Sequence, residues 1–231
     1  MSKIFLIRHG QASLGKANYD QLSELGARQA ELLGAYFAQL EVKPDLVVQG
    51  SMQRHAQTAN SLLTNLHCGA ERAEPSVQTN DLWNEFDFET LVKAYLAENS
   101  SELTAPKTPS DFFSLLKKAL LAWSDNKIES PLPETWLDFE SRIKSALSEL
   151  YTLASNPSNG TIFVVSSGGA ISMALKQILG TSNQTMIDLN LQTKNTGITE
   201  LFAKRGSCYL SAFNHVAHLS SSEHFKLITH A

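Results

Sequence analysis

Short, mainly apolar runs alternate with amphipathic stretches over the first third of this chain. Residues 3–7 (KIFLI) and 45–49 (DLVVQ) have the length and the β-branched content of strands. Residues 23–40 and 53–66 repeat apolar side chains at helical spacing, and Ser23 suits the N-cap of the first of these helices. The order strand, helix, strand, helix is typical of a parallel sheet with right-handed crossovers.

The middle of the chain is mainly helical in pattern. Residues 77–83 suit an edge strand, and helical patterns punctuated by prolines cover Glu89–Glu98, Ser110–Ser124 and Glu134–Leu153. We expect these helices to form an insertion over about residues 88–155 that caps the ligand edge of the sheet.

The last third returns to strand patterns. Residues 161–165 are a continuous apolar run, and a helical pattern follows over 170–179. The segments 197–203 and 207–213 alternate in polarity, which predicts a hairpin with its turn at 205–206.

The totals narrow the class of protein. A length of 231 residues fits a single domain over residues 1–231 with the insertion embedded in it, and 42% hydrophobic residues suit a globular core. A formal charge of −4 gives no basic footprint, so nucleic acid and membrane surfaces are not expected as partners. No apolar run approaches the ~18 residues of a spanning helix, and the first residues lack a signal-peptide pattern. We therefore expect a cytoplasmic protein.

The two cysteines, Cys68 and Cys208, show no metal-ligand spacing and are too few for a disulfide framework. We expect ordinary buried or half-buried thiols. Several histidines lie in the polar tail from residue 214 onward, where surface positions are expected rather than metal ligation.

Polar residues follow three of the predicted strands, at the edge where open α/β sheets bind ligands. They are Arg8 and His9 after the first strand, Ser51 and Arg54 after the second, and Ser167, Gly168 and Gly169 after the third long apolar run. Two guanidiniums and the backbone N–H groups of a helix N-terminus form a receptor for a tetrahedral dianion. A histidine beside it can attack phosphorus and carry the phosphoryl group, and a carboxylic acid can protonate the leaving alkoxide.

Five segments of the chain resemble motifs of the histidine phosphatase superfamily, which includes the cofactor-dependent phosphoglycerate mutases. They are RHGQ at 8–11, YDQLSELG at 19–26 followed by Gln29-Ala30, SMQRHAQTA at 51–59, LWNE at 82–85 and NTGIT at 195–199. The resemblance spans about residues 3–90 and 160–215 in the family's order. It implies an α/β fold, a three-layer α/β/α sandwich with a mostly parallel mixed sheet, in which one strand of the late hairpin is antiparallel.

The resemblance also implies roles for individual residues. His9 would be the nucleophile that becomes a phosphohistidine, and Arg8 and Arg54 would clamp the phosphoryl oxygens. Glu85 would protonate the leaving oxygen, although a carboxylate at the N-terminus of the following helix is the other interpretation of this residue. The family needs no metal, and we expect neither a metal nor another cofactor.

One position departs from the family's pattern. The family carries a second histidine in a V-S-H-G turn, whereas this chain has VSSGG at 165–169, so that Ser167 stands in the place of the histidine. A hydroxyl is a weaker donor than a protonated imidazole, and the loss of one preorganised donor costs roughly 10²–10³ in rate. Ser167 and Gly168 are still expected to bind phosphate. Alternatively, His55 or His215 reaches into the vacated position.

Three functions stay open at this point. The first is a phosphatase that hydrolyses a small-molecule phosphate monoester through a phosphohistidine at His9. The second is a catalytically idle protein that binds a phospholigand, because Ser167 replaces a catalytic histidine. A phosphoglycerate mutase-type phosphotransferase fits less well, because residues 12–20 are neutral, small and polar apart from Lys16, where the mutases have a basic W-N-x-x-N-x-F-x-G-W region.

Substrate specificity would come from the helical insertion. Five aromatic residues in or just before it either line a pocket for an apolar leaving group or, as their helical spacing favours, pack in the core; they are Trp83, Phe86, Phe88, Trp123 and Trp136. The oligomeric state is open, and a homodimer is one option.

Overall fold

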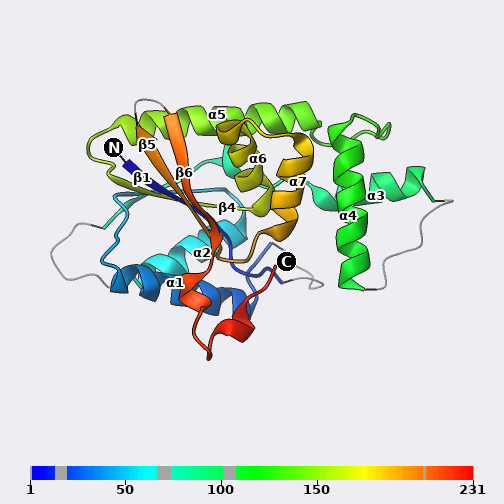
Figure 1. The fold of residues 1–231 in the computed structure, drawn as a ribbon. Coiled ribbons are helices and arrows are strands. Elements are labelled where there is room, and N and C mark those ends of the chain that lie inside the picture. Colours follow the sequence, from blue (N-terminus) through cyan, green and yellow to red (C-terminus); the bar gives the residue numbers. More distant parts are fainter. Residues whose placement is uncertain (1, 14–19, 67–73, 101–107, 205–206, 231) are drawn as a thin grey trace.

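The computed structural model describes residues 2–13, 20–66, 74–100, 108–204 and 207–230, with a six-stranded sheet at the centre of this part (Figure 1). The strands are β1 (Ser2–Arg8), β2 (Leu46–Gln49), β3 (Ser76–Thr79), β4 (Thr161–Ser166), β5 (Ile198–Lys204) and β6 (Ser207–His215). They lie in the order β3-β2-β4-β1-β5-β6; the first four are parallel neighbours, and β5 is antiparallel to both β1 and β6. The mostly parallel mixed sheet with one antiparallel hairpin strand is confirmed.

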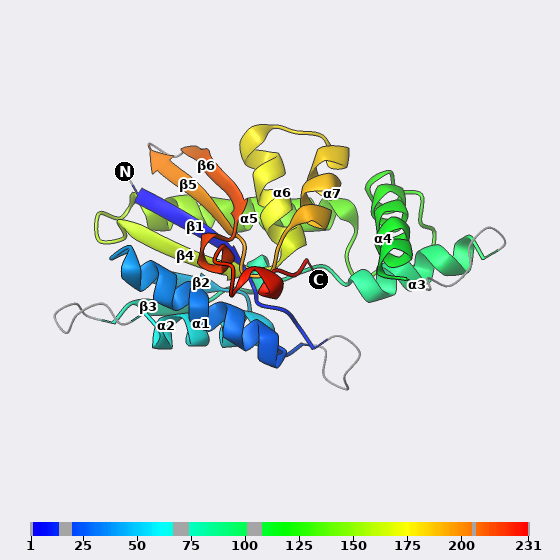
Figure 2. The ribbon, with the colours of Figure 1, turned by 60° about the horizontal axis from the view of Figure 1, so that its bottom comes forward.

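Helices cover both faces of this sheet and complete a three-layer α/β fold (Figure 2). The helices are α1 (Glu24–Gln39), α2 (Gln53–Thr64), α3 (Phe88–Glu98), α4 (Pro109–Ser124), α5 (Trp136–Ser155), α6 (Gly168–Leu179) and α7 (Asn183–Gln192). One face carries α1 and α2, the other carries α5 and α6, and α7 packs on α6. Short 3₁₀ helices are η1 (Asp81–Trp83), η2 (Ala217–Leu219) and η3 (Phe225–Leu227).

The central strands are apolar on both sides because both of their faces are covered. Along β1, Ile4 and Leu6 point into the core under α5 and α6, whereas Phe5 and Ile7 join the core under α1 and α2. Phe163 of β4 is the register partner of Phe5, and their rings meet edge to face with centroids 5.3 Å apart. This two-sided burial explains why these strands have continuous apolar runs instead of alternating polarity.

Two elements differ from the sequence prediction. The edge strand expected over 77–83 is shorter, because Asn80 accepts a hydrogen bond from the Leu82 backbone N–H and starts η1 after β3 has ended. Helix α7 was not predicted, because its polar and apolar residues (NQTMIDLNLQ) do not segregate into two faces; its start is fixed by the Ser182 hydroxyl, which accepts from Thr185 N.

The segment 88–155, expected to be one capping insertion, consists of two parts. Helices α3 and α4 lie beyond α7, away from the sheet (Figures 1 and 2), and α4 packs on both α3 and α7. Helix α5 instead runs along the sheet and contacts β1 and β5, and its residues Phe139 and Ile143 are fully buried. The last third of the segment is therefore a helix of the sandwich itself.

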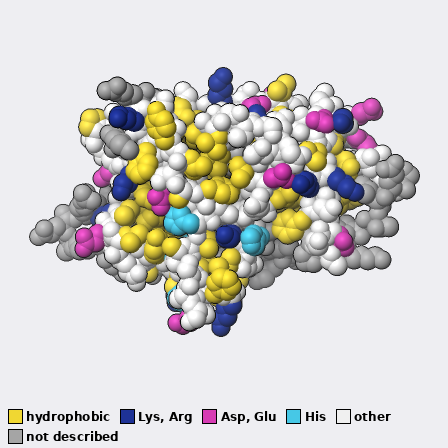
Figure 3. All heavy atoms as spheres, in the orientation of Figure 1, with side chains coloured by type: hydrophobic (Ala, Val, Ile, Leu, Met, Phe, Trp, Pro, Cys, Tyr) yellow, Lys and Arg dark blue, Asp and Glu magenta, His cyan; other side chains and the backbone are white. Residues whose placement is uncertain are grey.

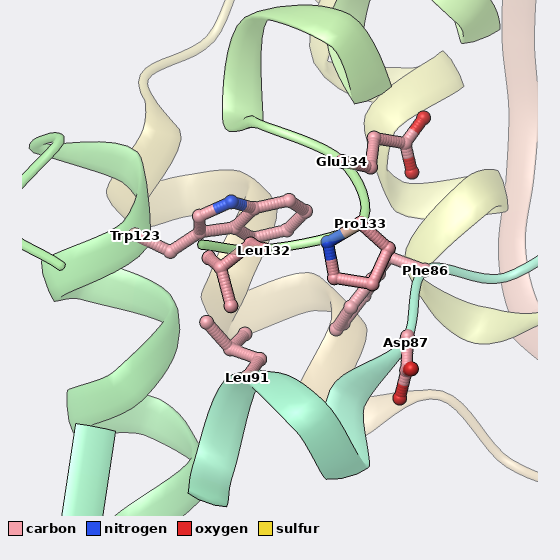
Figure 4. A pocket seen from close by; sticks show the side chains of 7 residues that line it. All are labelled: Phe86, Asp87, Leu91, Trp123, Leu132, Pro133 and Glu134. Atoms are coloured by element: carbon pink, nitrogen blue, oxygen red, sulfur yellow. The ribbon is translucent and has the colours of Figure 1, made fainter. Parts of the chain in front are cut away.

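Four of the five aromatic residues that the sequence singled out belong to the core. Trp83, Phe86, Trp123 and Trp136 are each at least 94% buried, and the Trp123 and Trp136 rings meet edge to face with centroids 5.1 Å apart. Two of them also line a small pocket between α3, α4 and the turn before α5 (Figure 4), whose lining residues are Phe86, Asp87, Leu91, Trp123, Leu132, Pro133 and Glu134. The core interpretation is therefore the one that the structure supports.

The surface and the cysteines add two observations. On the face shown in Figure 3, lysines and arginines lie singly or in small groups among acidic side chains. Cys208 is a buried free thiol whose pKa is raised to about 11 by burial, whereas Cys68 and the turn at 205–206 lie outside the described residues. Within the described ranges, no helix combines the length and the apolar character needed to cross a membrane.

Candidate active site

The parallel register of three strands brings the predicted site residues to one edge of the sheet. Arg8 ends β1 opposite Ser166, the last residue of β4, and the His9 N–H donates to Ser166 O at 2.8 Å. Strand β2 lies on the other side of β4 and leads into α2, which carries Arg54. Strands β1, β2 and β4 therefore bring His9, Arg54 and Ser167 together at one edge of the sheet, as the sequence predicts.

His9 is buried and held in one tautomer. Its Nδ1 lies 2.6 Å from the carbonyl oxygen of Gly10, so Nδ1–H donates to this oxygen and the proton-free nitrogen is Nε2. Burial lowers the pKa of His9 well below its ordinary value of 6.5, and the charges of Arg54 and Arg8 lower it further. The side chain is therefore a neutral imidazole with an available lone pair.

The peptide group that joins His9 to Gly10 is held by residues of two other motifs. Asn195 Nδ2 and the Thr196 backbone N–H each donate to His9 O at 3.2 Å, and Gly10 N donates to Thr58 Oγ1 at 3.1 Å. The NTGIT and QTA segments thus orient the histidine from two directions.

The two arginines lie close enough to His9 and Glu85 to act on both pKa values. Arg54 is buried, and its Nη1 donates to Asp20 Oδ1 at 2.7 Å, while Asp20 Oδ2 accepts from the first N–H of α2, that of Gln53, at 2.9 Å. The carboxylate of Asp20 fixes the guanidinium against the start of the helix.

Arg8 is held from the opposite side. Its Nη1 donates to Thr193 O at 2.5 Å, to Thr193 Oγ1 at 3.0 Å and to His230 O at 2.5 Å. Its Nε lies 3.5 Å from the position that a Cβ would take at Gly168, the first residue of α6. This places Arg8 beside the N-terminus of α6, where backbone N–H groups favour anions.

Glu85 is partly buried and faces the same helix terminus. Its Oε2 accepts from Gly169 N at 2.9 Å and its Oε1 from Phe86 N at 3.2 Å. Burial raises the pKa of Glu85 above its ordinary 4.5, although these two N–H donors and the arginine charges lower it in part. A Cβ at Gly169 would overlap Glu85 Oε1, so only glycine leaves room for the carboxyl group.

Ser167 and His55 form a direct contact in this site. The Ser167 hydroxyl lies 2.7 Å from His55 Nε2, both side chains are buried, and the rings of His55 and His9 have centroids 5.6 Å apart. His215, the other candidate for the vacated position, instead pairs with Glu200 Oε1 at 2.9 Å.

Sequence reasoning missed the contributions of Asp20, Gln29 and Thr193. Gln29 Oε1 accepts from Gln11 N at 2.9 Å, and its Nε2 donates to Leu227 O at 2.7 Å, which ties the loop after β1 to the last described residues. Asp20 and Gln29 lie in the motif segments that carried the resemblance, and no other feature of the sequence pointed to them. Nothing in the sequence pointed to Thr193. In the described part of the chain, no three His, Cys, Asp or Glu side chains gather in a way that could hold a metal ion.

The chain belongs to the histidine phosphatase superfamily (branch 1), whose family model matches residues 4–216. This match contains all five motif segments as well as Arg8, His9, Arg54, Glu85 and Ser167. The fold and the family that the sequence motifs indicated are therefore confirmed.

The individual relatives either match only part of this chain or share little sequence identity with it. The mitochondrial serine/threonine-protein phosphatase Pgam5 of Caenorhabditis briggsae is 31% identical over 116 residues, which are 46% of this chain and 41% of the relative. The chain thus spans less than half the length of this curated relative. Among solved structures, phosphoglycerate mutase from Bacillus anthracis has a TM-score of 0.66 at 17% identity and covers 94% of both chains. Phosphoserine phosphatase from Entamoeba histolytica has a TM-score of 0.63 at 23% identity and covers 95% of this chain and 100% of its own. Both structural likenesses concern the fold.

Proposed function

We propose that this protein hydrolyses small-molecule phosphate monoesters through a phosphohistidine at His9. The observation that carries the proposal is the tautomer of His9: because Nδ1–H donates to Gly10 O at 2.6 Å, Nε2 is left with its lone pair for phosphorus. Burial holds the pKa of His9 well below 6.5, so this nucleophile needs no separate base at neutral pH.

The reaction takes two steps. His9 Nε2 attacks the phosphorus atom, the bond from phosphorus to the ester oxygen breaks, and the carboxylic acid of Glu85 gives its proton to that oxygen. A water molecule then attacks the phosphohistidine, the phosphorus–nitrogen bond breaks, and the Glu85 carboxylate takes up the proton of the water. The products are an alcohol and inorganic phosphate.

The surrounding groups support this sequence of steps. The guanidiniums of Arg8 and Arg54 would bind the equatorial phosphoryl oxygens, together with the Ser167 hydroxyl and the N–H groups that begin at Gly168. Because the pKa of Glu85 is raised, a fraction of its carboxyl groups stays protonated at pH values above 4.5, as a general acid requires.

The names of the relatives are compatible with this proposal. Two of those described above are named as phosphatases, one of protein serine and threonine and one of phosphoserine, and the third is named as a mutase. Hydrolysis and phosphoryl transfer differ in the group that accepts the phosphoryl group, which is water in a phosphatase and a hydroxyl of the bound acid in a mutase. Rates of 3-phosphoglycerate conversion with and without 2,3-bisphosphoglycerate distinguish the two reactions, and we expect the bisphosphate not to raise the rate.

Hydrolysis of p-nitrophenyl phosphate at pH 5–7 tests the proposal, with wild type compared against His9→Ala and, as a matched control, His224→Ala from the polar tail. We expect turnover in wild type and His224→Ala and a loss of about 10⁴-fold or more in His9→Ala. Equal turnover in all three proteins would contradict the proposal.

The catalytically idle alternative predicts a different pair of results. An idle phospholigand-binding protein binds inorganic phosphate in calorimetry and turns over no phosphomonoester, whereas the proposed enzyme binds phosphate and also turns over phosphomonoesters. The cytoplasmic location and the homodimer stay predictions, and cell fractionation and size-exclusion chromatography test them.

A further inference from the structure

We propose that His55 is a positioning residue that supplies, through Ser167, the hydrogen-bond donor lost with the family's second histidine. This inference rests on the proposed phosphatase function and adds a residue to which the family resemblance assigns no role. His55 Nε2–H donates to Ser167 Oγ, and the Ser167 hydroxyl in turn donates to an oxygen of the phosphoryl group on its way to His9.

The contact joins two buried side chains from different elements. His55 lies in the first turn of α2 and Ser167 in the turn between β4 and α6, 112 positions apart in the chain, yet Nε2 and Oγ are 2.7 Å apart. Their exposed fractions are 0% and 1%. Water therefore does not compete for this hydrogen bond.

The Ser167 hydroxyl is not used for the role that its position suggests. Ser167 is the N-cap of α6, where a serine side chain usually accepts from a backbone N–H, but it makes no such bond within the described residues. Its oxygen is instead committed to His55. Since a hydroxyl has one donor and two acceptor sites, accepting from His55 leaves its own hydrogen for the phosphoryl group.

The direction of the hydrogen bond follows from the other ring nitrogen. His55 Nδ1 is buried and has no hydrogen-bond partner among the described residues. The ring is neutral, because burial and the Arg54 charge lower the pKa of His55 to about 3, so it carries a single proton. An N–H without an acceptor is a more costly defect than a lone pair without a donor, which places the proton on Nε2.

Gly50 leaves room for the ring in this position. A Cβ at Gly50 would overlap His55 Nδ1, and the Gly50 N–H donates to the carbonyl oxygen of Val165 in β4 at 3.1 Å. The end of β2 thus packs against the imidazole on the side away from Ser167. The ring is held where its Nε2 meets the serine.

A double-mutant cycle tests whether His55 acts through Ser167. His55→Phe, Ser167→Ala and the double variant are compared for kcat with p-nitrophenyl phosphate and for the Kd of orthovanadate. We expect each single variant to lose about 10²-fold in kcat and the double variant to be within about twofold of Ser167→Ala. If His55→Phe costs the same factor in both backgrounds, or nothing in wild type, the inference is wrong.

A pair of amide substitutions, His55→Gln and His55→Asn, keeps the test valid if His55→Phe fails to fold. The amide nitrogen of glutamine reaches the place of Nε2, whereas that of asparagine is too short to donate to Ser167. We expect His55→Gln to retain at least about tenfold more kcat than His55→Asn, and equal values would contradict the inference.

His218 provides the matched control. It is buried, its Nε2 lies 2.8 Å from the Thr196 hydroxyl, and its pKa is also lowered to about 3. We expect His218→Phe to change kcat by the same factor with and without Ser167→Ala. Non-additivity with Ser167 is then specific to His55.

The failure of this inference differs from a failure of the proposed function. If wild type turns over no phosphomonoester, the phosphatase proposal fails and the orthovanadate Kd tests the inference alone. Equal, non-additive weakening in His55→Phe and Ser167→Ala supports it, and additive or absent weakening overturns it.

Discussion

Glu85 and Gly169 meet at the N-terminus of α6, where Gly169 N donates to Glu85 Oε2 at 2.9 Å and a Cβ at this glycine would overlap Oε1. The carboxyl group that is proposed to protonate the leaving group is thus positioned by the turn that follows β4. The proposed acid and the backbone N–H groups that are proposed to bind phosphate therefore belong to one local structure.

Replacing Glu85 by glutamine tests its role as the acid. We expect Glu85→Gln to lower kcat/KM by about 10²–10⁴-fold for an alkyl phosphate, because the alkoxide then leaves without a proton. The loss of kcat/KM should be much smaller for p-nitrophenyl phosphate, whose leaving group is stable as an anion. The comparison uses kcat/KM because kcat also contains the second step, in which Glu85 is the proposed base for both esters. Steady-state rates on both esters measure this difference, and equal losses of kcat/KM would show that Glu85 does not protonate the leaving group.

Gly169→Ala tests the positioning of the same carboxyl group without changing its chemistry. The added methyl group displaces Glu85, so we expect a loss of kcat of about tenfold or more on alkyl phosphates. The matched control is Gly160→Ala, because a Cβ at Gly160 meets only Asp45 Oδ2, at 3.5 Å. A wild-type rate in Gly169→Ala would contradict the prediction.

The pH profile of kcat/KM should have its plateau in mildly acidic solution. The proposed mechanism needs His9 unprotonated and Glu85 protonated. Burial and two arginines lower the pKa of His9 well below 6.5, and burial raises the pKa of Glu85 above 4.5. We therefore expect kcat/KM to fall as the pH rises through the pKa of Glu85, and to fall on the acid side only well below pH 6.5. Glu85→Gln should lose the alkaline decline, and its persistence would assign this decline to another group.

Arg54→Lys tests the guanidinium at the site. Lysine lacks the planar fork that Arg54 uses toward Asp20 and, as proposed, toward the phosphoryl group, so we expect about 10²-fold loss of kcat/KM. Arg28→Lys is the control, since Arg28 pairs with Glu31 on the exposed side of α1. Comparable losses of kcat/KM in the two variants would show that Arg54 has no special role at the site.

Buried neutral histidines should make the protein sensitive to acid. The pKa of His55 and of His218 is lowered to about 3, mainly by burial, so below about pH 6.5 the unfolded chain binds protons that the folded chain does not. Stability is therefore highest above this pH and declines as the pH falls toward 3, by up to about 1.4 kcal/mol per pH unit for each histidine. Urea unfolding at pH 7, 6 and 5 measures the slope. His218→Phe should reduce this slope by the contribution of about one proton, up to about 1.4 kcal/mol per pH unit. An unchanged slope would contradict the lowered pKa of His218.

Several site residues were predictable because parallel strands end at one edge. Arg8 ends β1, while His9 and Ser167 directly follow β1 and β4, and these strands were visible as apolar runs. The Asp20–Arg54 pair and the His55–Ser167 contact were not predictable, since they depend on how a loop and α2 pack against other segments. The sequence named His55 and His215 as equal candidates, and only the tertiary structure separates them.

The helical segment 88–155 shows the same limit. Its periodicity predicted the helices within about two residues, but apolar spacing does not say which surface a helix covers. Helix α5 packs on the sheet, whereas α4 packs on α3 and α7. The assignment to one capping insertion failed for α5 for this reason.

The most direct test of the account is the chemical identity of the phosphorylated residue. Wild-type protein is mixed with ³²P-labelled phosphomonoester, quenched within milliseconds in alkali, digested and mapped. The account predicts an alkali-stable, acid-labile label on the peptide that contains His9, and no label in His9→Ala. An acid-stable label on Ser167, or turnover without any label, would contradict it.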